Sequence, residues 1–274
     1  MKCEFQLCIT RKEVPLKSVV CVKQVPDSAA RLTAQDGRPD WGDAPLIINP
    51  WDEYAVETAL LQQEVQGGEV IAISIGTEQA LETLKHALAM GVSQAILISD
   101  PALVKADSQA VARILAAAIN KIEAVDAAFF GRQAIDTDTG VTAAQTARCL
   151  GWPSLTLVSA IQSLDPAAGS IRVERSIEEG RQIVSARLPA VISVVKDIAE
   201  PRYPSFMGIR KASRAVIPAW SLADLGLDAP TSLVTWPEVM APPQREVNTE
   251  LITGANPQEI ATRLVDRILE EKVL

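Results

Sequence analysis

Histidine is nearly absent from this chain of 274 residues, and its cysteines are few and scattered. The single histidine is His86, and the cysteines form neither a CxxC pair nor a Cys/His cluster; they are Cys3, Cys8, Cys21 and Cys149. Zinc sites need such clusters at short spacings. The sequence therefore argues against a metal site and indicates reduced thiols in a cytosolic protein.

The usual signatures of catalysis and of phosphate binding are also missing. The chain has no GxSxG nucleophile elbow, no GxxxxGK[ST] phosphate loop and no GxGxxG dinucleotide turn. Each of these motifs places a nucleophile or backbone amides where the chemistry requires them. We therefore predict no catalytic side chains, and whether the chain is an enzyme stays open.

An excess of positive charge and long apolar runs are missing as well. The formal net charge is −8, which provides no broad positive field for a nucleic-acid backbone. Nowhere do 18 uncharged apolar residues follow one another, and the first 24 residues lack the apolar core of a signal peptide. We expect a soluble, cytoplasmic protein that binds small molecules or proteins, and neither nucleic acid nor the membrane interior.

Aliphatic side chains, in contrast, are abundant. They occur in short strand-like runs that alternate along the chain with helix-like segments. Hydrophobic residues make up 48% of the chain and aromatic residues only 4%, as in sheets that are buried on both faces. This alternation of strand and helix patterns predicts an α/β fold with a doubly wound, mainly parallel sheet. The expected strands are 18–23, 69–76, 95–99, 124–131, 153–161 and 189–195, and the expected helices are 50–66, 78–90, 108–121 and 142–151.

Two of these helices have apparent start signals. Asn49 precedes Pro50, and acidic residues fill the first turn that follows, so Asn49 is a predicted N-cap. Thr77 is the predicted N-cap of the next helix.

The last third of the chain departs from the alternation. Residues 171–188 have the pattern of an antiparallel hairpin with a short turn at 178–180. From residue 219 the chain is richer in proline and in isolated apolar residues, with one amphipathic helix at about 257–272. We predict a main domain at 17–218 and an extended C-terminal arm at 219–274, which wraps a partner or its own domain.

The stretch FFGRQAIDTDTG, residues 129–140, is the strongest candidate for a binding site. It follows a strand and opens a helix, where open α/β sheets bind ligands and where helix N–H groups favour an anion such as a phosphate. Gly131 permits a close approach of the backbone to a ligand. Further donors to phosphate oxygens are available at Thr139, Gly140 and Thr142.

The two aspartates of this stretch argue the other way. Asp136 and Asp138 would repel a phosphate unless they point away from it, cap the helix or accept hydrogen bonds. Helix capping therefore stays an alternative to nucleotide binding.

A second unusual stretch is EPRYPSFMGIRKASR, residues 200–214, which places apolar and aromatic side chains beside four basic residues. This composition is typical of a protein-docking patch. Its two prolines predict that it lies outside a helix interior. An ordinary loop over the core is the alternative.

Several blocks of the sequence resemble the electron transfer flavoprotein β-subunit and its FixA-like branch. They run in order over more than nine-tenths of the chain, from about Lys17, so that residues 1–16 would be an N-terminal extension. The blocks are VVCVKQVPD (19–27), INPWDEYAVETAL (48–60), ALAMG (87–91), GRQAIDTDTG (131–140), VERSIEEG (173–180), LPAVISV (188–194) and EPRYPSFMGIRKA (200–212).

The resemblance implies a sheet topology of the HUP type, which binds adenine nucleotides. It also implies a heterodimer with an α-subunit, and the redox-active FAD would lie mostly in that subunit. Such heterodimers pass electrons from flavin-dependent, acyl-CoA-type dehydrogenases to a quinone reductase, or split electron pairs between two acceptors. The C-terminal arm would pack on the α-subunit. Cofactor chemistry of this kind requires no catalytic side chain.

The resemblance also implies a nucleotide in this chain, which is AMP in simple carriers and a second FAD in bifurcating members. Asp138 and Thr139 match the FAD pattern, Thr142 matches the AMP pattern and Val141 matches neither, so the choice stays open. The implied cofactor-binding residues are Val22, Lys23, Gln24, Asn49, Asp52, Gly131, Gln133, Ala134, Asp136, Asp138, Thr139, Gly140 and Thr142.

Phe206 stands where the family has a leucine that docks into the dehydrogenase. The implied docking residues are Tyr203, Phe206, Met207, Arg210 and Lys211. Ser176 replaces an acidic residue that approaches the mobile flavin domain in simple carriers, which implies that this contact is either different or absent here.

Two other functions use a similar architecture. A stand-alone adenine-nucleotide-binding regulator of the universal-stress type lacks the hairpin and the arm. An ATP-dependent ligase or sulfurtransferase requires an SGGxDS-like loop after the first strand, where this chain has KQVPDS (23–28).

Overall fold

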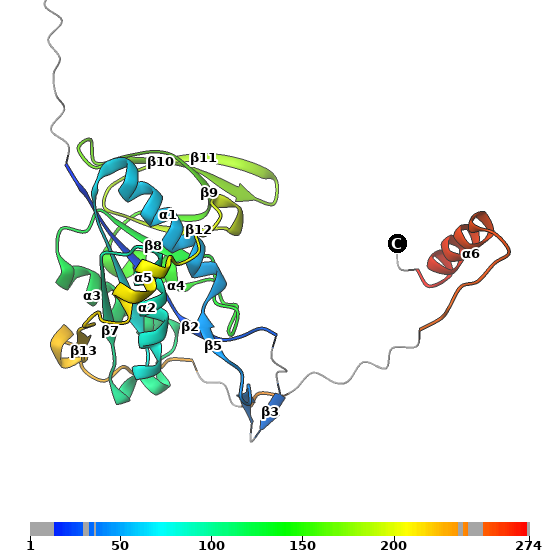
Figure 1. The fold of residues 1–274 in the computed structure, drawn as a ribbon, viewed down its shortest axis with the longest axis horizontal. Helices are drawn as coiled ribbons and strands as arrows, with labels where there is room; N and C mark the ends of the chain where they lie inside the picture. Colours follow the sequence, from blue (N-terminus) through cyan, green and yellow to red (C-terminus); the bar gives the residue numbers. More distant parts are fainter. Residues whose placement is uncertain (1–13, 30–32, 36, 235–237, 241–248, 273–274) are drawn as a thin grey trace, which may run out of the picture. The chain divides into compact units, whose positions relative to one another are not determined.

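The computed structural model describes residues 14–29, 33–35, 37–234, 238–240 and 249–272 (Figure 1). The chain divides into two compact units between Val239 and Met240. Cys3 and Cys8 lie outside the described residues, whereas Cys21 and Cys149 are free thiols. Most of the predicted N-terminal extension also lies outside them, but Leu16 is buried in the first strand.

The first unit is built on a nine-stranded sheet with the order β11-β10-β9-β12-β8-β1-β6-β7-β13. Neighbours from β9 across to β13 are parallel, and β9, β10 and β11 pair antiparallel. The predicted α/β fold, with its mainly parallel sheet and its hairpin, is confirmed. The strands are β1 (Leu16–Cys21), β6 (Gly68–Ile75), β7 (Gln94–Ile98), β8 (Ala127–Gly131), β9 (Ser154–Asp165), β10 (Ser170–Ile177), β11 (Gly180–Arg187), β12 (Ala190–Val194) and β13 (Ala219–Trp220).

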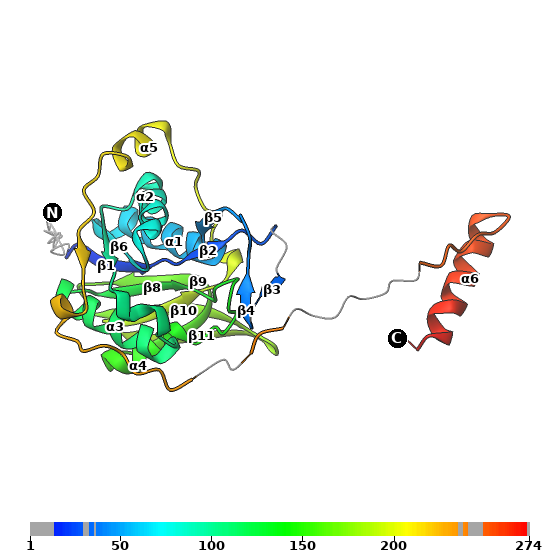
Figure 2. The same cartoon turned by 90° about the horizontal axis from the view of Figure 1, so that it is seen from below.

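Helices cover both faces of the sheet, as Figure 2 shows. On one face lie α1 (Pro50–Gln66) and α2 (Leu81–Met90), and on the other lie α3 (Ser108–Ile122) and α4 (Thr142–Leu150). Successive strand residues point to opposite faces. In β1, Val20 therefore packs in the core beneath α1 and α2, whereas Val19 and Cys21 pack beneath α3 and α4.

The order of the strands reverses at β1. The chain runs outward from β1 to β6 and β7, and then returns to β8 on the other side of β1. A doubly wound sheet binds its ligands outside the carboxyl ends of the strands at such a switch point. The ends of β1 and β8, at Cys21 and Gly131, meet at this point.

Short elements connect these layers. Strand β2 (Gln24–Pro26) pairs with β5 (Leu46–Ile48), and β3 (Thr33–Gln35) pairs with β4 (Arg38–Asp40). The remaining elements of the first unit are the 3₁₀ turns η1 (Glu78–Ala80), η2 (Pro101–Lys105), η3 (Lys196–Ile198) and η4 (Ala223–Leu225), and the helix α5 (Phe206–Ala212).

Two details of the helix starts differ from the sequence-based predictions. Thr77 makes no side-chain cap, because the turn η1 comes first and α2 begins only at Leu81. The segment 200–214 contains the helix α5, whose N-terminus is capped by the hydroxyl of Ser205, which accepts a hydrogen bond from Gly208 N at 3.0 Å. Its two prolines precede the helix and therefore do not interrupt it.

Residues 219–239 belong to the first unit, although the sequence predicted that the arm begins at residue 219. Strand β13 pairs with β7, and Leu222 is buried in the core beneath α3. The second unit holds the helix α6 (Pro257–Glu270), where Asn256 Oδ1 accepts a hydrogen bond from Glu259 N at 2.9 Å. Among the described residues, none of the helices combines the length and the apolar character that crossing a bilayer requires.

Candidate functional site

A cavity of about 360 Å³ opens at the carboxyl ends of β1, β6 and β8. Most of the predicted cofactor-binding residues line it: Val22, Lys23, Asn49, Asp52, Gly131, Gln133, Ala134, Thr139, Gly140 and Thr142. The other three, Gln24, Asp136 and Asp138, do not line it. Gln24 instead donates from Nε2 to the carbonyl oxygen of Gln79 at 2.8 Å.

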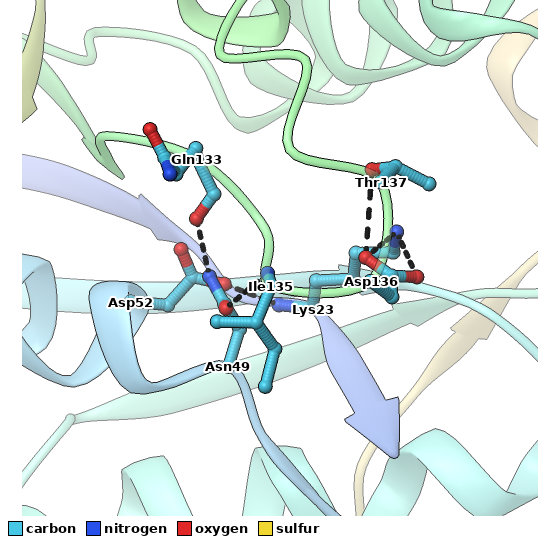
Figure 3. Close-up of polar contacts among 7 residues, drawn as sticks. All are labelled: Lys23, Asn49, Asp52, Gln133, Ile135, Asp136 and Thr137. Carbon is cyan, nitrogen blue, oxygen red and sulfur yellow. Dashed lines mark hydrogen bonds and ion pairs between the residues drawn. The ribbon is translucent and has the colours of Figure 1, made fainter. Parts of the chain in front are cut away.

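Asn49 clamps the loop that follows β8 (Figure 3). Its Nδ2 donates to Gln133 O at 2.8 Å, and its Oδ1 accepts from Ile135 N at 3.2 Å. Asn49 occupies the predicted N-cap position of α1, but its side chain makes no cap hydrogen bond there. Since both groups of the buried amide are engaged with the loop, Asn49 shapes the cavity wall.

Asp52 is a buried carboxylate beside the cavity. Its Oδ2 accepts from Lys23 N at 2.8 Å, which holds the turn after β1 against the start of α1. Burial raises the pKa of Asp52 to about 7, although hydrogen bonds from the Lys23 backbone, the Asn49 side chain and the Gly131 backbone oppose that rise. Burial also raises the pKa of the neighbouring Cys21 thiol, so that it stays a protonated, weakly reactive group.

Gly131 has a structural reason to be glycine. A Cβ at this position would overlap Asp52 Oδ1 and lie 2.6 Å from the carbonyl carbon of Trp51. The backbone at Gly131 therefore lies directly against the N-terminal turn of α1. Gly131 also lines the cavity.

The two aspartates of the loop are held by other loop and strand-end residues. Lys23 Nζ lies 2.6 Å from Asp136 Oδ2 (Figure 3). Gln133 Nε2 donates to Asp138 Oδ1. Helix α4 has Val141 at its N-cap position and no side-chain cap. Capping of this helix by Asp136 or Asp138, the alternative left open by the sequence, is therefore wrong.

The cavity is also lined by residues that were not among the predicted cofactor-binding residues. Ile75 could have been found, because β6 neighbours β1 and its carboxyl end must reach the same edge. Arg132, whose guanidinium lies 5.7 Å from the centre of the Trp51 ring, lies inside the candidate stretch 129–140 but was not itself predicted to bind. Val234 had no local signal, since it is brought to the cavity from a distant part of the chain. Residues of this kind are Cys21, Ile73, Ile75, Ala106, Asp107, Ser108, Val111, Leu115, Phe130, Arg132, Thr137, Ala143 and Val234.

Comparison with known proteins assigns the chain to a family. The electron transfer flavoprotein domain matches residues 42–225. Subunit CarD of the caffeyl-CoA reductase-Etf complex of Acetobacterium woodii is 36% identical over 94% of this chain and 100% of that protein. The electron transfer flavoprotein subunit beta of Thermoanaerobacterium thermosaccharolyticum is 35% identical over 93% and 99%, and FixA of Azorhizobium caulinodans is 37% identical over 77% and 76%.

This chain belongs to the electron transfer flavoprotein family. Within it, the chain is an electron-transfer subunit of the β-subunit and FixA type. Membership implies an α-subunit and further electron-transfer partners. Within the described ranges, no group of three or more His, Cys, Asp or Glu side chains is placed to hold a metal ion.

In this electron transfer flavoprotein subunit, the segment around α5 presents an apolar surface. Tyr203 is 94% exposed, Phe206 78% and Met207 69%. Arg210 and Lys211 are exposed in the last turn of α5. The predicted docking residues thus lie exposed on α5 and, in the case of Tyr203, on the segment just before it.

That surface is fixed to the body of the unit at two points. A Cβ on Gly208 would overlap the carbonyl oxygen of Ala89, so α5 crosses α2 at close range. Arg202 binds the buried Glu57 of α1 through Nε and Nη2, each at 2.8 Å, and binds Glu64 through Nη1 at 2.8 Å. The pKa of Arg202 is raised, chiefly by the hydrogen bond to Glu57. The exposed side chains are therefore presented from a rigid base.

Proposed function

We propose that the chain is the β-subunit of a heterodimeric electron transfer flavoprotein, which accepts electrons from a flavin-dependent dehydrogenase and passes them through FAD to a quinone reductase or another acceptor. One observation carries the proposal: full-length subunits of such systems match the chain almost from end to end. The matched domain also includes Asn49, Asp52 and the loop 131–140, which shape the cavity.

The cavity suits an adenine nucleotide, either AMP or FAD. Its walls combine apolar side chains such as Ile73, Ile75 and Phe130 with the first turn of α4. An adenine ring fits the apolar walls, and a phosphate fits a helix N-terminus whose N–H groups are not capped by a side chain. When bound, FAD supplies reversible electron transfer, whereas AMP supplies none.

The acidic residues of the loop do not oppose this ligand. Asp136 is ion-paired with Lys23, and Asp138 accepts a hydrogen bond from Gln133. Both carboxylates thus have partners of their own, and neither lines the cavity. Thr139 and Thr142 do line it and offer hydroxyl donors to phosphate oxygens.

The α-subunit is the partner whose presence tests the proposed function. Co-expression of the full chain with a tagged α-subunit should yield a stable one-to-one complex with bound flavin. Helix α6 supports such a complex, because in the second unit the side chains of Leu264, Val265 and Leu269 remain exposed. A stable monomer with no affinity for the α-subunit would contradict the proposal and favour a stand-alone nucleotide-binding regulator.

Phe206 is the proposed anchor for the dehydrogenase, with Arg210 and Lys211 beside it. Because aromatic anchors carry much of the energy of an interface, Phe206→Ala should raise the KM for the reduced dehydrogenase about tenfold. The variant should leave the heterodimer and its nucleotides intact, since the Phe206 side chain is exposed. Steady-state electron transfer at varied dehydrogenase concentration measures the effect.

Val104→Ala is the matched control for this prediction. Val104 is 86% exposed and lies outside the α5 segment. Its replacement should change neither the KM nor the maximal rate. Equal kinetics of Phe206→Ala and the wild type would remove Phe206 from the docking surface.

A further inference from the structure

A short segment from the end of the first unit forms an outer wall of the cavity. We call residues Ser232, Leu233 and Val234 the strap. Val234 lines the cavity together with Asp107 and Ser108, which lie at the start of α3. The strap and this helix start are more than 120 residues apart in the chain, so this wall exists only because the two segments are held together.

Asp107 holds the strap through direct hydrogen bonds. Its Oδ2 accepts from Leu233 N at 2.7 Å and from Val234 N at 3.1 Å. Its own backbone N donates to Ser232 Oγ at 3.0 Å. Leu233 and Val234 are 72% and 58% exposed, so burial of their side chains contributes little to the attachment of the strap. The hydrogen bonds to Asp107 provide most of that attachment.

The two oxygens of Asp107 have separate partners. Oδ1 accepts from Ala110 N at 2.8 Å and caps α3, whereas Oδ2 binds the strap. The backbone donors, of which Ala110 has the largest effect and Leu233 the next, hold the pKa of Asp107 below its usual value. The carboxylate therefore stays ionised, as both contacts require.

The chain is anchored again on either side of the strap. Upstream, Lys121 Nζ donates to Asp224 O at 2.6 Å and lies 4.6 Å from the centre of the Trp220 ring. Downstream, Val239 N donates to Gly37 O at 3.1 Å, in the turn between β3 and β4. Loss of the Asp107 contact would thus free the strap at the cavity while its flanks stay attached.

We propose that Asp107 is a positioning residue that closes the strap over the nucleotide cavity, so that its hydrogen bonds to Leu233 and Val234 slow the release of a bound adenine nucleotide. The inference rests on the proposed function, because it requires that this cavity binds a nucleotide. Asp107 acts through the strap and not through bonds to the reacting group of a cofactor.

Asp107→Asn separates the two duties of the carboxylate. An amide has a single acceptor oxygen, and asparagine is itself a good N-cap, so the variant should keep the helix cap and lose the strap contact. Nucleotide release should become about tenfold faster, because changes at a binding site act mainly on the dissociation rate. Asp107→Ser, which keeps a cap and removes the second oxygen, serves if the first variant folds poorly.

Asp100→Asn is the matched control. Asp100 has the same arrangement outside the cavity, with Oδ1 accepting from Ala102 N at 2.9 Å and Oδ2 accepting from Leu222 N at 3.3 Å. Both variants are prepared as the full heterodimer and loaded with FAD or radiolabelled AMP, and bound nucleotide is followed after rapid dilution. Because both carry the same α-subunit flavin, a difference between them reports on the site of this chain.

The association rate distinguishes an opened wall from a damaged site. A released strap should leave association as fast as in the wild type or faster, whereas damage through α3 should slow it. Equal release from Asp107→Asn, Asp100→Asn and the wild type would overturn the inference and leave the proposed function standing. If the wild type binds neither nucleotide in this chain, the proposed nucleotide site fails, and the inference fails with it.

Discussion

Gly131→Ala is expected to cost about 3 kcal/mol of the free energy of unfolding, because the added methyl group meets the backbone of α1 where nothing can move aside cheaply. The new Cβ would overlap Asp52 Oδ1 and lie 2.6 Å from the carbonyl carbon of Trp51. Relief of this steric overlap requires that β8 and the start of α1 move apart. This movement would also widen the cavity. We therefore expect the purified complex to lose the nucleotide of this chain. Chemical denaturation and nucleotide quantification measure the two effects.

Gly169→Ala is the control for this substitution. Gly169 has a φ of 61° and nothing within 4 Å of an added Cβ, so only backbone strain of about 1 kcal/mol is expected. Its nucleotide content should equal that of the wild type. Equal stability losses in the two variants would contradict a specific role for the contact between Gly131 and α1.

Asp52 should make the stability depend on pH in a direction that is unusual for a carboxylate. Its pKa is about 7 in the folded protein and 3.8 as a model value for the unfolded chain. Between these values the folded state holds a proton that the unfolded chain releases, so the free energy of unfolding falls as the pH rises. The contribution is fully present below about pH 4 and lost above about pH 7, and amounts to about 4 kcal/mol.

Asp52→Asn isolates this contribution, since asparagine has a similar shape and does not titrate. The difference in unfolding free energy between the wild type and the variant, from denaturation at several pH values, should shift against the wild type by about 4 kcal/mol from pH 4 to pH 8. Other carboxylates titrate in both proteins and cancel in the difference. A difference that stays constant across this range would show that Asp52 is ionised throughout.

The alternation of strand and helix patterns was sufficient to predict the fold. Five of the six aliphatic runs are separated from one another by predicted helices, and this pattern permits few arrangements other than a doubly wound parallel sheet. The loop 131–140 was also predictable as a candidate site, because a strand end followed by a helix start marks the ligand edge of such a sheet. Comparison with known relatives then identified the family.

Side-chain roles were less predictable, because one residue type serves several purposes. An asparagine before a proline is typical of a helix N-cap, yet Asn49 uses both groups of its amide on the loop after β8. Asp136 and Asp138 at a helix start suggested capping, yet Lys23 and Gln133 engage them. In each case the partner lies in another part of the fold or on the far side of a turn, where local pattern gives no information.

The strap shows the same limit over a longer distance. Nothing in the sequence of Ser232, Leu233 and Val234 marks them as a cavity wall, and the segment was predicted to belong to the arm. The carboxylate of Asp107 and the pairing of β13 with β7 bring this part of the chain back to the sheet. Contacts of this kind cannot be predicted from sequence, since a single carboxylate can bind backbone N–H groups from any segment.

The central claim is that this chain contributes an adenine-nucleotide site to an electron transfer flavoprotein heterodimer. The most direct test is to purify the complex with its α-subunit, denature it, and quantify the FAD and AMP released per heterodimer. Two FAD, or one FAD and one AMP, would agree with the account, and the count itself would decide between a second redox flavin and a structural nucleotide in this chain. A single FAD with no further adenine nucleotide would contradict it.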